Sequence, residues 1–269
     1  MTYEELYSQI QKKKSCLCVG LDTDLNKIPQ HLLSLENPIF EFNKAIVDAT
    51  APYCVAYKPN IAFYEAEGVS GWQQLEMTVS YIRSKYPEMF IIADAKRGDI
   101  GNTAALYAKA FFEKMDFDAV TLAPYMGRDA IDPFLKYEGK WVIVLALTSN
   151  ASAEDFETKQ LSDGRPLFQE VIENMNGIVP ESHQRVMYVV GATRAEKLAQ
   201  IRKFSPKHFY LVPGVGAQGG SAEDVLKYGS NDSCSLLINS SRAIIYASKG
   251  EDFAQAAAQA AKNSGCYWK

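Results

Sequence analysis

The sequence predicts an α/β fold, a (β/α)₈ (TIM) barrel in a single domain, on three observations. The chain has 269 residues, a length that α/β barrels reach as one domain. Eight short apolar runs alternate with amphipathic stretches of helical length. No shift in composition and no Pro- or Ser-rich linker divides the chain, so we expect one domain over residues 1–269.

The eight apolar runs are rich in β-branched and aliphatic residues, which is typical of strands buried on both faces of a parallel sheet. We expect strands at 15–22, 54–60, 90–96, 119–124, 141–148, 186–192, 209–214 and 235–241. A doubly wound sheet is the alternative, but it usually has fewer strands and a glycine-rich fingerprint after the first one. Here the first run ends in Leu21-Asp22-Thr23-Asp24, without that fingerprint.

Amphipathic stretches between these runs predict the helices. Apolar residues repeat at helical spacing in 40–49, 72–86, 103–115, 194–204 and 222–228, and an alanine-rich stretch at 252–262 predicts a closing helix. The run Lys12-Lys13-Lys14 is expected on a solvated helix face. The longest polar gap, 149–164, follows the fifth strand, where barrel loops carry chemistry, so we expect it to cover the active site.

Composition and charge exclude several classes of protein. Apolar residues make up 47% of the chain and charged residues 22%, the balance of a globular domain. The 28 basic and 32 acidic residues give a net charge of −4, which lacks the basic footprint of a nucleic-acid binder. No apolar run is long enough to span a membrane. Because the five cysteines are odd in number and no signal peptide precedes them, we expect reduced thiols and a cytoplasmic protein.

Polar and charged side chains gather where the predicted strands end. In a barrel, the carboxyl ends of all strands meet at one face. Inward charges are costly there unless they are paired, and a pattern on most strands favours a polar site over one structural ion pair. These side chains are Asp22, Lys58, Asp94, Lys96, Asp99, Thr148, Ser149 and Arg242.

The third strand carries the sharpest signal. Its period of two places Asp94 and Lys96 on one face, which we expect to point into the barrel. A carboxylate beside an inward ammonium keeps that ammonium charged, so the pair could stabilise and protonate a developing carbanion. A purely structural pair is the alternative. Asp94 and Asp99 could also hold Mg²⁺, although the intervening Lys96 argues against this.

A glycine-rich segment after the seventh strand predicts an anion site. Residues 213–220 read Pro-Gly-Val-Gly-Ala-Gln-Gly-Gly, and their glycines let main-chain N–H groups point at an anion. Phosphate sites in these barrels are commonly built after strands seven and eight, and Arg242 after the eighth strand can fork onto phosphate oxygens. Asp22 and Lys58 suit the hydroxyls of a sugar, with a salt bridge at the rim as the alternative.

Motifs for several other chemistries are missing from the sequence. It holds no H-E-x-x-H, no G-x-S-x-G, no P-loop and no Cys/His cluster, so we expect no metal, no nucleotide cofactor and no covalent nucleophile. The histidines His31, His183 and His208 lie in helical or loop segments, and we expect them at the surface.

The segment after the third strand and the glycine-rich segment after the seventh resemble the orotidine 5′-monophosphate decarboxylase family, in particular its larger bacterial (type 2) branch. Residues 94–103, Asp-Ala-Lys-Arg-Gly-Asp-Ile-Gly-Asn-Thr, match the family signature D-x-K-x-x-D with its D-I-x-x-T continuation. Residues 213–220 match the family's P-G-V-G-x-Q-G-G phosphate loop, and the likeness extends from Leu21 to Arg242. Compact members carry Gly before that Arg, where this chain has Ser241.

The resemblance implies cofactor-independent decarboxylation of orotidine 5′-monophosphate to UMP and CO₂, in pyrimidine biosynthesis, by a homodimer with shared active sites. It implies that Lys96 protonates C6 of the pyrimidine and that Asp94 lies beside the substrate carboxylate. Asp99 and Thr103 would enter the neighbouring subunit's site. The remaining contacts would come from Asp22 and Lys58 to the ribose, Thr148 to the pyrimidine, and Gln218 and Arg242 to the phosphate.

Two alternatives share these features. A Mg²⁺-dependent sugar-phosphate decarboxylase of the same barrel group, such as 3-keto-gulonate 6-phosphate decarboxylase, carries the D-x-K-x-x-D motif too. A barrel that only binds a phosphorylated ligand would use Lys96 structurally. Turnover of orotidine 5′-monophosphate in excess chelator would separate these alternatives from the decarboxylase.

Overall fold

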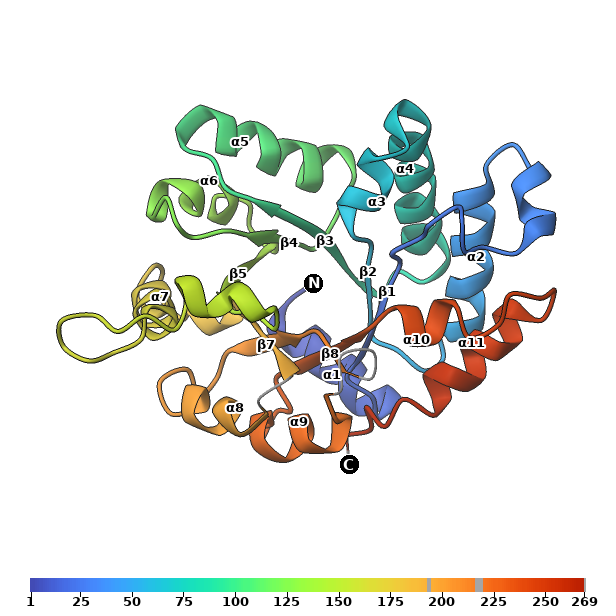
Figure 1. The fold of residues 1–269 in the computed structure, drawn as a ribbon. Helices are drawn as coiled ribbons and strands as arrows, with labels where there is room; N and C mark the ends of the chain where they lie inside the picture. Colours follow the sequence, from blue (N-terminus) through green and yellow to red (C-terminus); the bar gives the residue numbers. More distant parts are fainter. Residues whose placement is uncertain (193–194, 216–219, 269) are drawn as a thin grey trace.

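The structure, a computed structural model that describes residues 1–192, 195–215 and 220–268, is a closed barrel of eight parallel strands (Figure 1). The strands follow one another in chain order, and β8 pairs with β1 to close the barrel. They are β1 (Leu17–Gly20), β2 (Ala56–Lys58), β3 (Phe90–Arg97), β4 (Ala119–Leu122), β5 (Trp141–Leu147), β6 (Val186–Val190), β7 (Phe209–Val212) and β8 (Leu236–Ser240). The predicted fold class and the eight predicted strands are confirmed.

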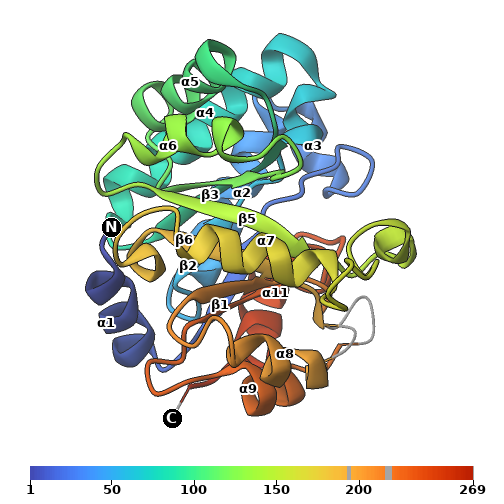
Figure 2. The same ribbon diagram turned by 90° about the vertical axis from the view of Figure 1, so that its left-hand side faces the viewer.

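Helices alternate with the strands and lie outside the barrel (Figures 1 and 2). They are α1 (Tyr3–Lys13), α2 (Pro38–Thr50), α3 (Ile61–Glu65), α4 (Gly68–Lys85), α5 (Gly101–Lys109), α6 (Asp132–Leu135), α7 (Leu167–Asn176), α8 (Ala195–Arg202), α9 (Ala222–Gly229), α10 (Arg242–Ile245) and α11 (Phe253–Lys262). The helices bury their apolar residues, as α2 shows with Phe42, Ile46 and Val47 buried.

Several helices differ from the prediction. The stretch 103–115 is α5 followed by a π-helical turn, Ala110–Lys114. Sequence reasoning gave no bounds for α1 and missed α3, α6, α7 and α10, most of which are too short to show a clear helical period. Helix α7 is longer and buries Phe168, Ile172 and Met175, but it follows the polar gap directly.

The N-terminal segment packs over the amino-terminal ends of the strands. Thr2 and Glu5 form a capping box that starts α1, and the Tyr3 ring packs edge-on against Phe209 at the start of β7. The Lys13 ammonium donates to the carbonyl oxygens of Ala51 and Cys54, at 2.9 and 3.0 Å. The expectation that Lys13 lies on a solvated helix face is therefore wrong. Its side chain links α1 to the end of α2.

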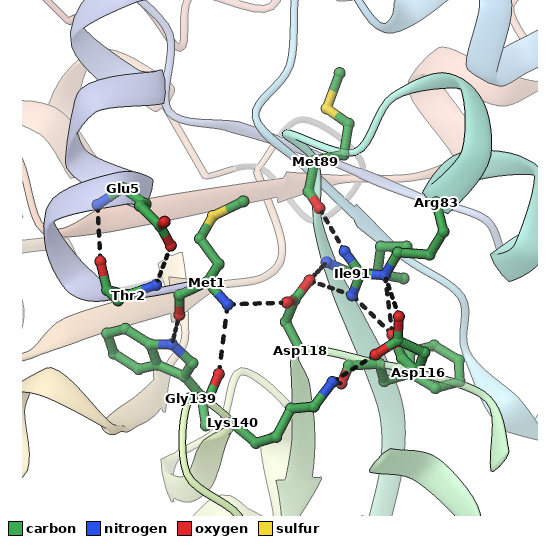
Figure 3. A network of polar contacts seen from close by, with 12 residues as sticks. Met1, Thr2, Glu5, Arg83, Met89, Ile91, Asp116, Asp118, Gly139 and Lys140 are labelled. Carbon is green, nitrogen blue, oxygen red and sulfur yellow. Dashed lines mark hydrogen bonds and ion pairs between the residues drawn. The ribbon is translucent and has the colours of Figure 1, made fainter. Parts of the chain in front are cut away.

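A polar network around Asp118 joins the same end of the barrel to α4 (Figure 3). Asp118, only 4% exposed, precedes β4 and accepts hydrogen bonds from Arg83 Nη2 at 2.6 Å and from the Ile91 N–H at 2.8 Å. The amino nitrogen of Met1 lies 3.3 Å from the other carboxylate oxygen. One buried carboxylate thus links α1, α4, β3 and β4.

Buried side chains form one continuous core around the barrel. All five cysteines are free and buried, which agrees with reduced thiols that pack as small apolar groups. The expectation of surface histidines is wrong for His208, which is 6% exposed and hydrogen-bonded through Nε2 to Ser182 Oγ at 3.0 Å. Among the described residues, no helix combines the length and apolar character needed to cross a membrane.

Candidate active site

A cavity of about 330 Å³ opens at the carboxyl-terminal face of the barrel. Six of the predicted site residues line it: Asp22, Lys58, Asp94, Lys96, Thr148 and Arg242. They come from the ends of β1, β2, β3 and β5 and from the start of α10. The strand ends thus bring together side chains that are up to 220 positions apart in the chain, 242 − 22.

Four charged side chains of alternating sign form a chain along one wall of the cavity. Lys58 Nζ lies 2.6 Å from Asp94 Oδ2 and 3.9 Å from Asp22 Oδ1. Lys96 Nζ lies 2.5 Å from Asp94 Oδ1. Sequence reasoning had separated Asp22 and Lys58 from Asp94 and Lys96, but the structure makes them one network, Asp22–Lys58–Asp94–Lys96.

This network keeps Asp94 ionised. Burial alone would raise the pKa of the Asp94 carboxyl, but the ammonium groups of Lys58 and Lys96 outweigh burial and hold that pKa well below its ordinary value. Burial opposes the charge of Lys58 too, yet Asp94 and Asp22 raise the Lys58 pKa above its usual range. Both Asp94 oxygens therefore face cations. Among the described residues, no three His, Cys, Asp or Glu side chains are grouped as a metal site would require.

The backbone of β3 departs from regular alternation at Lys96. Its φ is +46°, in the left-handed region that non-glycine residues rarely adopt, and the pairing with β4 shifts register between Ala93 and Arg97. Thr121 on β4 holds this irregularity, because its Oγ1 accepts from the Lys96 N–H at 2.9 Å and donates to Asp94 Oδ1 at 3.2 Å. The Lys96 side chain is 51% exposed in the single chain, at the mouth of the cavity rather than inside the barrel.

Asp99 and Thr103 do not reach this cavity. Neither is among the described residues that line it, and Asp99 Oδ1 accepts from the Ile100 N–H at 2.8 Å. Thr103 is exposed on the first turn of α5. The D-x-K-x-x-D signature is therefore divided, with Asp94 and Lys96 facing the cavity of their own chain and Asp99 outside it.

The gap after β5 contributes a residue that sequence reasoning missed. Glu157 accepts from the Thr148 N–H at 2.7 Å and from Thr148 Oγ1 at 2.8 Å. Both Thr148 and Ser149 line the cavity. A glutamate nine residues after Thr148 gives no sequence signal of this role, because the intervening loop has no regular period.

A close approach of β1 to the residue before Arg242 shapes this end of the cavity. A Cβ on Gly20 would lie 1.8 Å from Ser241 Oγ, so β1 needs a glycine where the residue before Arg242 passes. Gly214, with φ +94°, and Val215 line the same end. Asn239, 7% exposed, lines the floor and donates through Nδ2 to Ser241 Oγ at 3.3 Å. The predicted phosphate contact Gln218 lies outside the described residues.

Comparisons with known proteins show which family this chain is similar to. The model of the Orotidine 5′-phosphate decarboxylase / HUMPS family matches residues 15–259. The chain is 60% identical over 262 residues to an orotidine 5′-phosphate decarboxylase of Phocaeicola vulgatus, covering 97% of this chain and 96% of the relative. It is 59% identical to the same enzyme of Flavobacterium johnsoniae, over 97% of this chain and 94% of the relative.

Solved structures give the same result. The OMP decarboxylase of Leishmania donovani superposes with a TM-score of 0.81 at 34% identity, covering 98% of both chains. The family model spans most of the sequence, and the curated relatives match it over nearly their full length. The chain therefore belongs to the Orotidine 5′-phosphate decarboxylase / HUMPS family.

Proposed function

We propose that this chain is an orotidine 5′-phosphate decarboxylase, which converts orotidine 5′-monophosphate to UMP and CO₂ in pyrimidine biosynthesis. The observation that carries the proposal is the four-membered network Asp22–Lys58–Asp94–Lys96 on one wall of a cavity that Arg242 borders. Such a site offers fixed charges to a reacting carboxylate and a cation to a phosphate. The names of the relatives, at up to 60% identity, support the same substrate.

In the proposed reaction, the bond between C6 of the pyrimidine and the carboxylate carbon breaks. Its electron pair stays on C6, CO₂ leaves, and the Lys96 ammonium gives that pair its proton. Asp94, held ionised by two lysines, lies beside the departing carboxylate and orients Lys96. Fixed charges of this kind favour the transition state because they need no reorganisation when charge develops.

The rest of the nucleotide would be bound by the other residues of the cavity. We assign the ribose hydroxyls to Asp22 and Lys58, since a carboxylate accepts and an ammonium donates. Thr148 would contact the pyrimidine from a position that Glu157 holds. Arg242, with Gln218, would bind the phosphate.

We also propose that the enzyme is a homodimer whose subunits share active sites. Asp99 and Thr103 would act in the site of the second copy, which is supported by their position outside the cavity of their own chain. Large apolar side chains are exposed in the same stretch of chain and after β4. These are Ile100, Leu106, Tyr125 and Met126, which are 51%, 59%, 91% and 53% exposed. Exposed apolar side chains of this kind mark a protein–protein interface.

We also propose that the protein lies in the cytoplasm.

The experiment is to incubate the purified protein with orotidine 5′-monophosphate in excess EDTA and to follow the loss of pyrimidine absorbance. Turnover to UMP with release of CO₂ is expected. No turnover would contradict the proposal. Activity that returns only with Mg²⁺, or only on a sugar-phosphate acid, would favour the metal-dependent alternative.

A further inference from the structure

We propose that Tyr246 is a positioning residue that keeps the ribose-binding and phosphate-binding ends of the site in register. The inference rests on the proposed function, which assigns Asp22 to the ribose and Arg242 to the phosphate. Tyr246 follows α10, whereas Asp22 follows β1, 224 positions earlier in the chain. The tyrosine hydroxyl joins these two segments beyond the point where β1 pairs with β8 and Gly20 passes Ser241.

The hydroxyl of Tyr246 fixes the backbone around Asp22 from two sides. It donates to the Asp22 carbonyl oxygen at 2.9 Å and accepts from the Asp24 N–H at 2.7 Å. One hydrogen and one lone pair are thus used on two groups of the same short segment. A phenylalanine at this position would keep the ring and lose both contacts.

The opposite side of Tyr246 is tied to the phosphate end. Its N–H donates to the Arg242 carbonyl oxygen at 3.3 Å, within the short helix α10 that begins at Arg242. The ring stacks on Phe42 of α2, with centroids 6.0 Å apart. Because Tyr246 is fixed in this way relative to Arg242, its hydroxyl transmits the position of α10 to Asp22.

Other contacts hold the Asp22 segment without reaching the phosphate end. The Tyr64 hydroxyl donates to the Leu21 carbonyl oxygen at 2.9 Å, and Thr23 Oγ1 donates to Asn43 Oδ1 at 2.6 Å. The partners Tyr64 and Asn43 belong to α3 and α2, respectively. Loss of the Tyr246 hydroxyl should therefore leave the fold intact while the spacing of Asp22 and Arg242 becomes loose.

This spacing matters because a nucleotide contacts both ends at once. Binding energy from a remote phosphate promotes the chemical step only when the groups at the two ends are held in the geometry of the transition state. When the spacing of Asp22 and Arg242 is loose, the phosphate contact of Arg242 contributes less to stabilising the transition state. The effects of Tyr246 and Arg242 should accordingly depend on each other.

The test is a double-mutant cycle with Tyr246→Phe and Arg242→Ala, measured as kcat and KM for orotidine 5′-monophosphate, and as UMP affinity where turnover is too slow. The matched control is Tyr188→Phe. The buried Tyr188 hydroxyl on β6 donates to Asn176 Oδ1 at 2.8 Å, and Tyr188 does not line the cavity. Thermal unfolding of every variant shows whether it folds.

We expect Tyr246→Phe to lower kcat/KM about tenfold in the natural background, with a loss in kcat as well as a rise in KM, and to have a much smaller effect beside Arg242→Ala. Tyr188→Phe should leave kcat/KM unchanged both in the natural background and beside Arg242→Ala. An equal loss in both backgrounds, or natural activity in Tyr246→Phe, would overturn the inference. Absence of turnover by the unmodified enzyme would contradict the proposed function instead.

Discussion

Asp94 determines the electrostatics of the site, because among the described residues it is the one carboxylate that both lysines contact. Its Oδ2 pairs with Lys58 and its Oδ1 with Lys96, at 2.6 and 2.5 Å. Lys58 is 3% exposed, so without Asp94 it would keep only Asp22, at 3.9 Å. A buried cation left with one distant partner is costly. The placement of Lys96 and the charge of Lys58 therefore depend on the same residue.

Lys96→Ala is expected to abolish turnover while the fold survives. The ammonium supplies the proton in the proposed reaction, and loss of a general acid lowers rates by ~10²–10⁴ or more. The side chain is 51% exposed, so its removal leaves no core cavity. Steady-state turnover and circular dichroism check both points, with Lys85→Ala as the control, since Lys85 is 49% exposed on α4. A Lys96→Ala enzyme that retains most of its activity would disprove the proton-donor role.

His208 predicts how stability depends on pH. Burial, with smaller contributions from His183 and Arg202, lowers the pKa of His208 to about 3. The unfolded chain binds a proton near pH 6.5, so below this pH the unfolded state holds more protons and folding becomes less stable as pH falls. One such group lowers the free energy of unfolding by ~2 kcal/mol between pH 8 and pH 5.

Urea titrations at several pH values measure this dependence. His208→Phe removes the titrating group, so its stability should fall less steeply over the same range. The control is His31→Phe at the surface, which should keep the natural slope. If His208→Phe and the unmodified protein show parallel curves, burial of this imidazole does not govern the acid sensitivity.

At the level of single residues, the sequence predicted which side chains gather and that Asp94 pairs with Lys96, but not that Lys58 contacts Asp94. Strand ends in a barrel converge, so Asp22, Lys58, Asp94 and Lys96 could be expected at one face. The partner of Lys58 depends on barrel register and tilt, which apolar runs do not encode. Thr121 was missed for the same reason, because it meets Lys96 only through a register shift between β3 and β4.

At the level of elements, the strands could be predicted because parallel strands buried on both faces read as continuous apolar runs. The helices were harder, since a short helix that covers a strand needs only one or two buried side chains. Helix α3 buries Ile61 and Tyr64 within five residues. No periodic pattern can be recognised over so short a stretch.

Asp118→Asn is expected to destabilise the joint between α1, α4, β3 and β4. Breaking a buried, hydrogen-bonded ion pair costs about 3 kcal/mol or more, and the Asp118 side chain is 5% exposed beside Arg83. Asp116→Asn is the matched control, since Asp116 pairs with the same arginine but is 62% exposed. Its cost should stay below about 1 kcal/mol.

Urea unfolding of the two variants gives the comparison. The joint lies at the starts of β3 and β4, whereas the cavity lies at the strand ends, so kcat/KM per folded molecule should be unchanged in both. Equal stability of Asp118→Asn and Asp116→Asn would show that burial of the Asp118 pair contributes little.

At the level of the whole molecule, the net charge of −4 gives no hint of the site. The charges of the site are local and balanced, with two carboxylates and two ammonium groups in one network. The surface around Asp99 has a different character, with Tyr125 91% exposed and Leu106 59% exposed. Burial of this patch against a second copy would bring Asp99 and Thr103 to the neighbouring cavity.

The most direct test of the shared site mixes two inactive variants, Lys96→Ala and Asp99→Ala, under conditions where subunit exchange is shown independently. A hybrid dimer would contain one site with both natural residues. Random exchange predicts recovery of about a quarter of the natural activity, with each variant alone remaining inactive. No recovery despite proven exchange would contradict the claim that Lys96 of one subunit and Asp99 of the other complete a single active site.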